Sequence, residues 1–200
     1  PLGILAAVKR NRMADRVVRV VALLGVSVPG FALSILVILV LSLFFGYYPP
    51  LNYVGLLENP AKNLEIMFLP ALILGCSMSG SVMRMTRSSV LEVLRQDFIK
   101  TVRAKGASER VAIFKHALRN ALIPIVTLVG LQIGSLLGGA VVVEQIFSLP
   151  GLGLMTLTGI NNRDYPVVQG CDLFIAFVYV LVNLVVDLLY AYIDPRISYD

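Results

Sequence analysis

Of the 200 residues, 58% are hydrophobic and only 14% are charged, with a formal net charge of +5. Soluble chains contain about 45–50% apolar and about 25% charged residues, so this composition excludes a soluble domain. A disordered chain is also excluded, because disorder requires low hydrophobicity and high charge. The two cysteines, Cys76 and Cys171, lie in apolar runs, which excludes a disulfide scaffold. A membrane protein remains, and since a spanning helix takes about 20 residues, this length allows about four spans.

The chain opens with an apolar run, residues 1–8, that is too short to cross a bilayer. It has neither an initiator Met nor the charged region that begins a signal peptide. We therefore expect it to be the end of a preceding span, in a chain that lacks its N-terminal part.

Four apolar stretches follow in chain order, of which the first three are uncharged and the last contains Asp172 and Asp187. The first is residues 20–48, which we expect to form one long span kinked at Pro29. The others are a short span within 65–84, a span within 119–144 and a last one over about 165–193. The sequence therefore predicts an all-α, polytopic membrane helix bundle with about four full spans.

Small residues mark one face of the third span. Gly130, Gly134 and Gly138 are spaced four residues apart, which places them together on a helix. Such a face allows close packing of helices in lipid.

Basic residues are concentrated before the first span and between the second and third spans. By the positive-inside rule, segments 9–19, 84–119 and 194–200 face the cytoplasm, whereas 49–64 and 145–164 face outside. The net positive charge follows from this asymmetry. A nucleic-acid partner is not expected, because the basic loop is held between two spans.

The cytoplasmic loop is strongly patterned. Ser89 and Glu92 form the S-x-x-E pattern of a capping box, which predicts the start of a helix. Behind it, apolar residues recur on one helical face: Leu91, Leu94, Phe98 and Val102.

Gly106 then predicts a helix end in the left-handed region, and Ser108 predicts the cap of a second helix. A second apolar stripe follows: Val111, Phe114 and Leu118. The loop is either an amphipathic segment lying on lipid or a docking surface for a cytosolic partner.

The loop resembles the EAA loop of ABC-importer permeases in its spacing, through the run Lys100-Thr101-Val102-Arg103-Ala104-Lys105-Gly106, followed nine residues later by His116-Ala117-Leu118-Arg119. Gly106 and Leu118 match the family pattern. Five positions depart from it: Lys100, Thr101, Val102, His116 and Arg119.

A longer resemblance, to the dipeptide/oligopeptide/nickel branch of these permeases, covers essentially the whole chain. It is carried by Thr86-Arg87-Ser88-Ser89, Arg103-Ala104-Lys105-Gly106, His116-Ala117-Leu118-Arg119-Asn120-Ala121-Leu122-Ile123-Pro124, Gly138-Gly139-Ala140-Val141-Val142-Val143-Glu144, Pro150-Gly151-Leu152-Gly153, Asn162-Arg163-Asp164-Tyr165-Pro166-Val167-Val168-Gln169 and Asp194-Pro195-Arg196.

The resemblance implies one transmembrane domain over 1–200, with a cytoplasmic coupling loop at 86–119, in a multi-pass protein of a bacterial or archaeal plasma membrane. Members of this branch carry a further span, an external region and a second span upstream, and residues 1–8 match the end of that second span.

The implied partners are a second permease subunit, two cytosolic ATPase subunits and an extracytoplasmic solute-binding protein. Peptides are the implied solute, with nickel chelates or glutathione-like peptides as alternatives. The ATPase contact is implied at Arg95, Lys100, Thr101, Val102, Arg103, Ala104, Lys105, Gly106, Ala107 and Ser108.

The chain has no residues typical of an enzyme. It contains no G-x-x-x-x-G-K-[ST] motif, so ATP and Mg are expected on the partner subunits. His116 is the single histidine, which argues against a His/Cys metal site. No Ser–His–Asp arrangement is convincingly spaced, so we expect no catalytic residue.

Three residues are candidates for the pathway or for packing. Asp187 lies within the last span with Asn183 one turn earlier, and we favour packing or a salt bridge with Arg196 or a loop arginine. Glu144, at the outer end of the third span, either lines the external mouth or marks the end of the span. An ion-coupled carrier that uses Asp172 or Asp187, or an intramembrane enzyme, remains an alternative; the patterned loop favours the permease.

Overall fold

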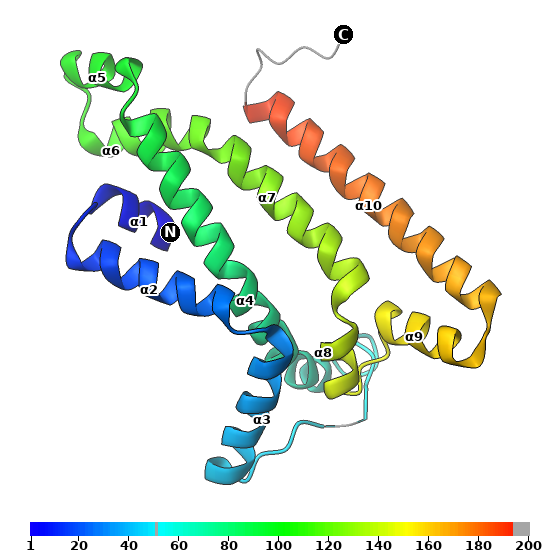
Figure 1. The fold of residues 1–200 in the computed structure, drawn as a ribbon. Helices are drawn as coiled ribbons and strands as arrows, with labels where there is room; N and C mark the ends of the chain where they lie inside the picture. The colour runs from blue at the N-terminus through cyan, green and yellow to red at the C-terminus, as the bar shows by residue number, and fades with distance from the viewer. Residues whose placement is uncertain (51, 194–200) are drawn as a thin grey trace. The chain divides into compact units, whose positions relative to one another are not determined.

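The computed structural model describes residues 1–50 and 52–193, and within them every regular element is helical (Figure 1). The all-α prediction is therefore confirmed for this part of the chain. The motif Asp194-Pro195-Arg196 and the inner segment 194–200 lie outside the described residues. The helices are α1 Leu2–Val8, α2 Met13–Ser27, α3 Gly30–Phe45, α4 Pro60–Leu94, α5 Asp97–Ala104, α6 Glu109–Val111, the π-helix η1 Ala112–Ala117, α7 Leu118–Gly139, α8 Val141–Ile146, α9 Leu152–Asn162 and α10 Tyr165–Ile193.

The chain forms two compact units. Among the described residues, unit 1 consists of 1–25, 79–132 and 181–193, and unit 2 consists of 26–50, 52–78 and 133–180. Helices α2, α4, α7 and α10 each contribute residues to both units. The contacts of each unit are described separately below.

Three helices are long and apolar enough to cross a membrane: Pro60–Leu94, Glu109–Leu137 and Tyr165–Ile193. A fourth span is formed if the bent pair Met13–Ser27 and Gly30–Phe45 is counted as one. The expected number of spans is confirmed on that basis, and α10 has the bounds expected for the last span.

The first span is broken where a kink was expected. Helix α2 ends at Ser27 and α3 begins at Gly30, so the prediction of one continuous helix is wrong. Pro29 is the N-cap residue of α3 with an extended ψ of 140°. Proline has no N–H to donate and restricts the residue before it, and here both effects end the preceding helix. Pro70 and Pro124, by contrast, lie within α4 and α7.

The second span is much longer than its uncharged stretch. Helix α4 has 35 residues, which at about 1.5 Å per residue exceeds the roughly 30 Å hydrocarbon core. It therefore continues through Arg84 and beyond the apolar layer. Ser89 lies inside this helix and is buried, so the prediction of a capping box there is wrong. Tertiary packing explains the difference, because Val90 and Val93 on the same turns are buried in a core cluster.

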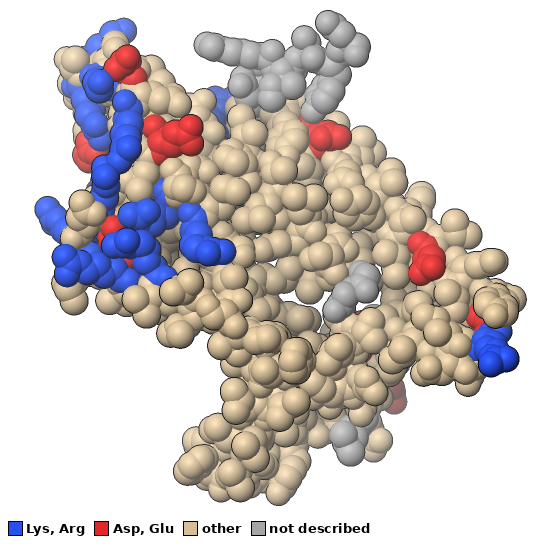
Figure 2. Space-filling view, viewed as in Figure 1, with Lys and Arg blue, Asp and Glu red and all other residues tan. Residues whose placement is uncertain are grey.

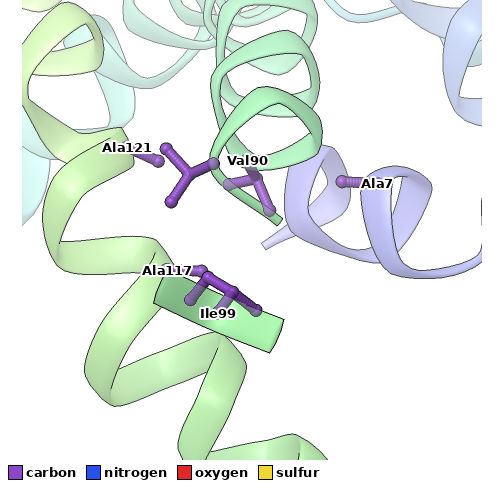
Figure 3. Packing of buried hydrophobic residues seen from close by; sticks show 6 residues of the cluster. Ala7, Val90, Ile99, Ala117 and Ala121 are labelled. Atoms are coloured by element: carbon purple, nitrogen blue, oxygen red, sulfur yellow. The ribbon is translucent and has the colours of Figure 1, made fainter. Parts of the chain in front are cut away.

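That cluster forms the core of unit 1. It joins α1, α4, α5, η1 and α7 through side chains that are almost fully buried: Ala7, Val90, Val93, Ile99, Ala117 and Ala121. Figure 3 shows Ile99 beside Ala117, with Val90 and Ala121 close by. Three of the six residues are alanines, so the helix backbones approach one another closely here.

Helices α7 and α10 are also closely packed. In unit 1, a Cβ added to Gly130 would meet the side chain of Val186 at 2.5 Å. In unit 2, a Cβ added to Gly134 would meet the ring of Tyr179 at 2.3 Å. The predicted glycine face is thus confirmed at these two positions.

Unit 2 has its own apolar cluster, in which α4 packs with α8 and the turn after it. Its buried members are Ile66, Ile73, Val143, Phe147 and Leu149. After it, α9 ends at Asn162, with Arg163 as its C-cap in a left-handed conformation, and α10 begins at Tyr165. The Asp164 carboxylate accepts a hydrogen bond from the Val167 N–H at 3.3 Å, which caps α10.

Candidate functional site

Helix α5 is a short amphipathic helix held to unit 1 by one buried side chain. Ile99 has no exposed surface and packs in the core cluster. Phe98, a member of the predicted apolar stripe, is 38% exposed. The prediction that this stripe runs along one helix is wrong, because α4 and α5 are separate helices and no single helical register runs through Arg95 and Gln96. Ile99 was therefore missed, since periodicity across that break pointed to its neighbour.

Gly106 ends α5 as predicted. Its φ is +83°, in the left-handed region, and its N–H donates to the carbonyl of Arg103 at 2.9 Å. The N–H of Ala107 donates to the carbonyl of Val102 at 3.3 Å. These two bonds are those of a Schellman motif, which fixes the direction of the chain as it leaves the helix.

Ser108 occupies the N-cap position of α6, also as predicted, with extended backbone angles. Its side chain makes no capping hydrogen bond to the backbone of α6 within the described chain, so the hydroxyl does not act as the sequence suggested.

A salt bridge spans the turn instead. Arg103 Nε donates to Glu109 Oε2 at 3.0 Å, and Arg103 Nη2 donates to Glu109 Oε1 at 2.7 Å. This bidentate pair joins α5 to α6 on either side of Gly106. Because both side chains are substantially exposed, its contribution to stability is expected to be about 0.2–1 kcal/mol. Its main effect is to fix the angle of the turn.

A second exposed pair lies within α5 itself. Lys100 Nζ donates to Asp97 Oδ1 at 2.7 Å, across one helical turn. The hydrogen bond and the positive charge of Lys100 lower the pKa of the Asp97 carboxyl. Asp97 also lies in the first turn, where negative charge favours the helix dipole.

The segment after the turn presents large apolar side chains to the outside. Val111 is 40% and Phe114 is 60% exposed, whereas the buried face carries Ala112, Ile113 and Ala117. The second predicted stripe is therefore exposed at Val111 and Phe114, as a stripe that faces lipid or a partner would be.

Most of the predicted coupling residues are thus accessible. Eight are exposed and two, Val102 and Ala107, are partly buried; the exposed ones are Arg95, Lys100, Thr101, Arg103, Ala104, Lys105, Gly106 and Ser108. Figure 2 shows Lys and Arg gathered over α2, α5 and the adjoining end of α4. A rigid, basic helix with exposed apolar neighbours is suited to binding a protein surface.

One buried ion pair in unit 1 was missed in the sequence. Asp15 is fully buried in α2 and is paired with Arg87 of α4, with Arg19 at 3.4 Å from the same carboxylate. Its backbone partner is the Asn11 N–H, at 2.9 Å. The available signal was that Asp15 is the single acid among the basic residues before the first span.

Glu144 has a structural role in unit 2 that the sequence did not reveal. It lies in α8, and its Oε2 accepts a hydrogen bond from the Leu154 N–H at 2.7 Å, in the first turn of α9. Added Cβ atoms at Gly151 and Gly153 would lie 2.2 Å and 3.0 Å from this carboxyl group. The Pro-Gly-Leu-Gly turn thus leaves room for a carboxylate that caps α9.

Asn183 and Asp187 are one turn apart on α10, as expected, with Asn183 partly buried and Asp187 exposed. Asp172 is exposed on the same helix. The proposed partner Arg196 lies outside the described residues, and Arg119, a loop arginine, donates from Nε to the carbonyl of Ile193 at 2.9 Å. A role for Asn183 or Asp187 in the pathway stays a prediction.

Residues 1–199 match the family described as the inner membrane component of binding-protein-dependent transport systems. The chain belongs to this family. As a member of it, the chain is a multi-pass membrane protein of a transport system, which agrees with the long apolar helices.

Several relatives of this transport component align over nearly the whole chain. A protein of Brucella abortus (strain 2308) that carries the name of a peptide transport system permease is 47% identical over 199 residues, and a similarly named protein of Brucella suis biovar 1 (strain 1330) shares the same identity. The glutathione transport system permease GsiC of Escherichia coli (strain K12) is 45% identical over 197 residues. The alignments cover 100% and 98% of this chain, but only 63% and 62% of the lengths of these relatives.

Proposed function

We propose that this chain is part of the permease subunit of an ATP-driven importer that carries peptides across the bacterial or archaeal inner membrane. Family membership and the names of the relatives support the proposal. Glutathione is itself a small peptide, so the E. coli relative falls within the same solute class. The solute-binding protein, a second permease subunit and two cytosolic ATPases complete the proposed transporter.

One observation carries the coupling role: α5 is exposed on its basic face and fixed at both ends. Ile99 anchors it to the core cluster, and the turn at Gly106 joins it to the helix that leads into α7. A force applied to such an element moves the helices behind it rather than bending a loose loop. We propose that an ATPase subunit binds residues 95–108 and that α5 transmits its movement to α4 and α7.

Energy must come from that partner, because the sequence has no phosphate-binding glycine loop. ATP and Mg are therefore proposed to bind the ATPase subunits, and no cofactor is proposed for this chain. Within the described residues, no group of three His, Cys, Asp or Glu side chains is placed to hold a metal ion. The concentration of basic residues in 84–119 supports a cytoplasmic position for this loop.

The test is reconstitution of the full-length permease with its partner subunits in liposomes. Uptake of a labelled dipeptide or of glutathione should require internal ATP and the binding protein, and should be insensitive to proton and sodium ionophores. Uptake that follows an ion gradient and ignores ATP would refute the proposal. A Lys100→Glu/Lys105→Glu variant should lose ATPase binding in detergent while still inserting in the membrane.

A further inference from the structure

A basic pocket of about 710 Å³ lies in unit 1, outside the surface assigned to coupling. It is formed mainly by α2 and α4, and α7 contributes Leu128. Its polar lining includes three arginines: Arg19, Arg84 and Arg87. Three guanidinium groups around one cavity repel one another unless negative charge is present.

Within the described residues, the positive charges of this pocket are only partly balanced. Asp15 is bound to Arg87 through two hydrogen bonds of 2.6 and 3.0 Å, and it lies 3.4 Å from Arg19. Arg84 is exposed and forms no ion pair within residues 1–50 and 52–193. Two of the three cations, Arg87 and Arg19, therefore share the Asp15 carboxylate. Asp15 holds Arg87 in place, while Arg19, half exposed, and Arg84 keep donors free for an anion.

The rest of the lining is apolar or weakly polar. Leu23, Met85 and Leu128 form its hydrophobic part, and Ser81 and Ser88 add hydroxyl groups. A soluble anion would use the arginines and serines but not the hydrophobic part. A molecule that carries a phosphate next to hydrocarbon would use both.

The position in the sequence agrees with such a ligand. Arg19 is the last charge before the first uncharged stretch, and Arg84 is the first charge after the second. Under the positive-inside orientation, both lie where the helices leave the hydrocarbon layer on the cytoplasmic side, at the level of the lipid phosphates. Arginine forms bidentate bonds with phosphate, and basic pockets between helices on this side suit anionic headgroups.

We propose that this pocket binds the phosphate-bearing headgroup of an anionic phospholipid from the inner leaflet, bridging α2 and α4. The phosphate pairs with Arg19 and Arg84, and the acyl chains begin along Leu23 and Leu128. The same phosphate chemistry could be supplied by a soluble phosphate ester, which the experiment must distinguish. The inference does not depend on which solute is transported.

The test uses the full-length permease with its partner subunits, stripped of lipid in a mild detergent. Phosphatidylglycerol or phosphatidylcholine with the same acyl chains is titrated in, and bound lipid is counted by native mass spectrometry. The pocket variant is Arg19→Gln/Arg84→Gln, which leaves the Asp15–Arg87 pair intact. The matched control is Arg12→Gln/Arg16→Gln, which removes the same charge from exposed positions that neither line the pocket nor belong to the coupling segment.

Phosphatidylglycerol should bind the wild type in preference to phosphatidylcholine, with affinity at least about tenfold lower in the pocket variant and within about twofold of wild type in the control. Millimolar glycerol phosphate should not displace it. Equal binding by the pocket variant and the wild type, or an equal loss in the control, would overturn the proposal. Displacement by glycerol phosphate would show that the pocket binds a soluble phosphate ester, and would overturn the proposal that its ligand is a lipid.

Discussion

Arg87 donates from Nε to Asp15 Oδ1 at 2.6 Å and from Nη2 to Asp15 Oδ2 at 3.0 Å, across 72 residues of sequence. This bidentate bond joins the start of α2 to the C-terminal part of α4. The carboxylate is fully buried and its remaining partners are the Asn11 N–H and Arg19, so its charge is compensated from three directions. A buried pair of this kind fixes a unique helix arrangement, because the sliding of either helix would leave a buried charge unpaired.

Asp15→Asn should destabilise the protein, because it leaves the Arg87 guanidinium without its counter-charge. The cost should be about 3 kcal/mol, at the low end for a broken buried pair since Arg87 is still partly reached by solvent. The thermal unfolding midpoint of the full permease in detergent measures it.

The matched control for this variant is Asp97→Asn, which removes an exposed carboxylate and should change the midpoint little. Asp15→Asn/Arg87→Gln should be less destabilised than the sum of the two single variants, because neither charge is left alone. Additive effects would show that the pair does not act as a unit.

Gly106→Val should impair transport while leaving membrane insertion intact. The φ of +83° is costly for a β-branched residue, by about 1–2 kcal/mol, whereas an added Cβ has no atom within 4 Å to clash with. The effect should therefore arise from the direction of the turn and not from packing. ATP-dependent uptake, with ATPase activity measured in parallel, is the readout.

Two substitutions separate backbone strain from a general intolerance of change. Gly106→Asn should retain more uptake than Gly106→Val, because asparagine tolerates the left-handed region. Gly75→Ala, in α4 and also free of neighbours, should be neutral. Normal transport by Gly106→Val would refute the coupling role of this turn.

Arg103→Glu should weaken the link between α5 and α6 by placing two carboxylates opposite each other across the turn. Uptake should fall more with Arg103→Glu than with Arg103→Gln, which only removes the positive charge. The double variant Arg103→Glu/Glu109→Arg should recover part of the loss, because it restores an ion pair with the two charges exchanged. The measured quantity is solute imported per ATP hydrolysed. If the reversed pair recovers nothing, Arg103 acts by contacting the partner and not by stabilising the turn.

The sequence predicted the elements that depend on local chemistry. Charge boundaries located α10 from Tyr165 to Ile193, and the conformational freedom of glycine identified the end of α5 at Gly106. Features that depend on contacts between distant segments were not predictable in this way. The S-x-x-E pattern at Ser89 is a valid local signal, but buried neighbours keep that residue inside α4.

In the candidate site, too, some features were predictable from the sequence and others were not. The exposed basic face of the coupling segment follows from composition, whereas its anchor, Ile99, depends on where α4 ends. Asp15 and Glu144 bind partners on other helices. From the sequence, only the unusual positions of these two acids could be noticed, and their partners could not be predicted. Arg103 and Glu109 are six residues apart across a turn, a spacing for which helical periodicity gives no expectation.

Gly151→Ala should destabilise α9 by displacing the Glu144 carboxylate that caps it. The new Cβ would lie 2.2–2.5 Å from the carboxyl atoms, and the flexible side chain can move away only by giving up its hydrogen bond to the Leu154 N–H. The cost should be that of a lost cap, about 1 kcal/mol, observed as faster amide hydrogen exchange in the first turn of α9. Gly170→Ala, with no neighbour within 4 Å, is the matched control. In a Glu144→Ala background the cap is already absent, so Gly151→Ala should cause almost no further loss of stability. A further loss of about 1 kcal/mol in that background would mean that Gly151 is needed for the turn itself.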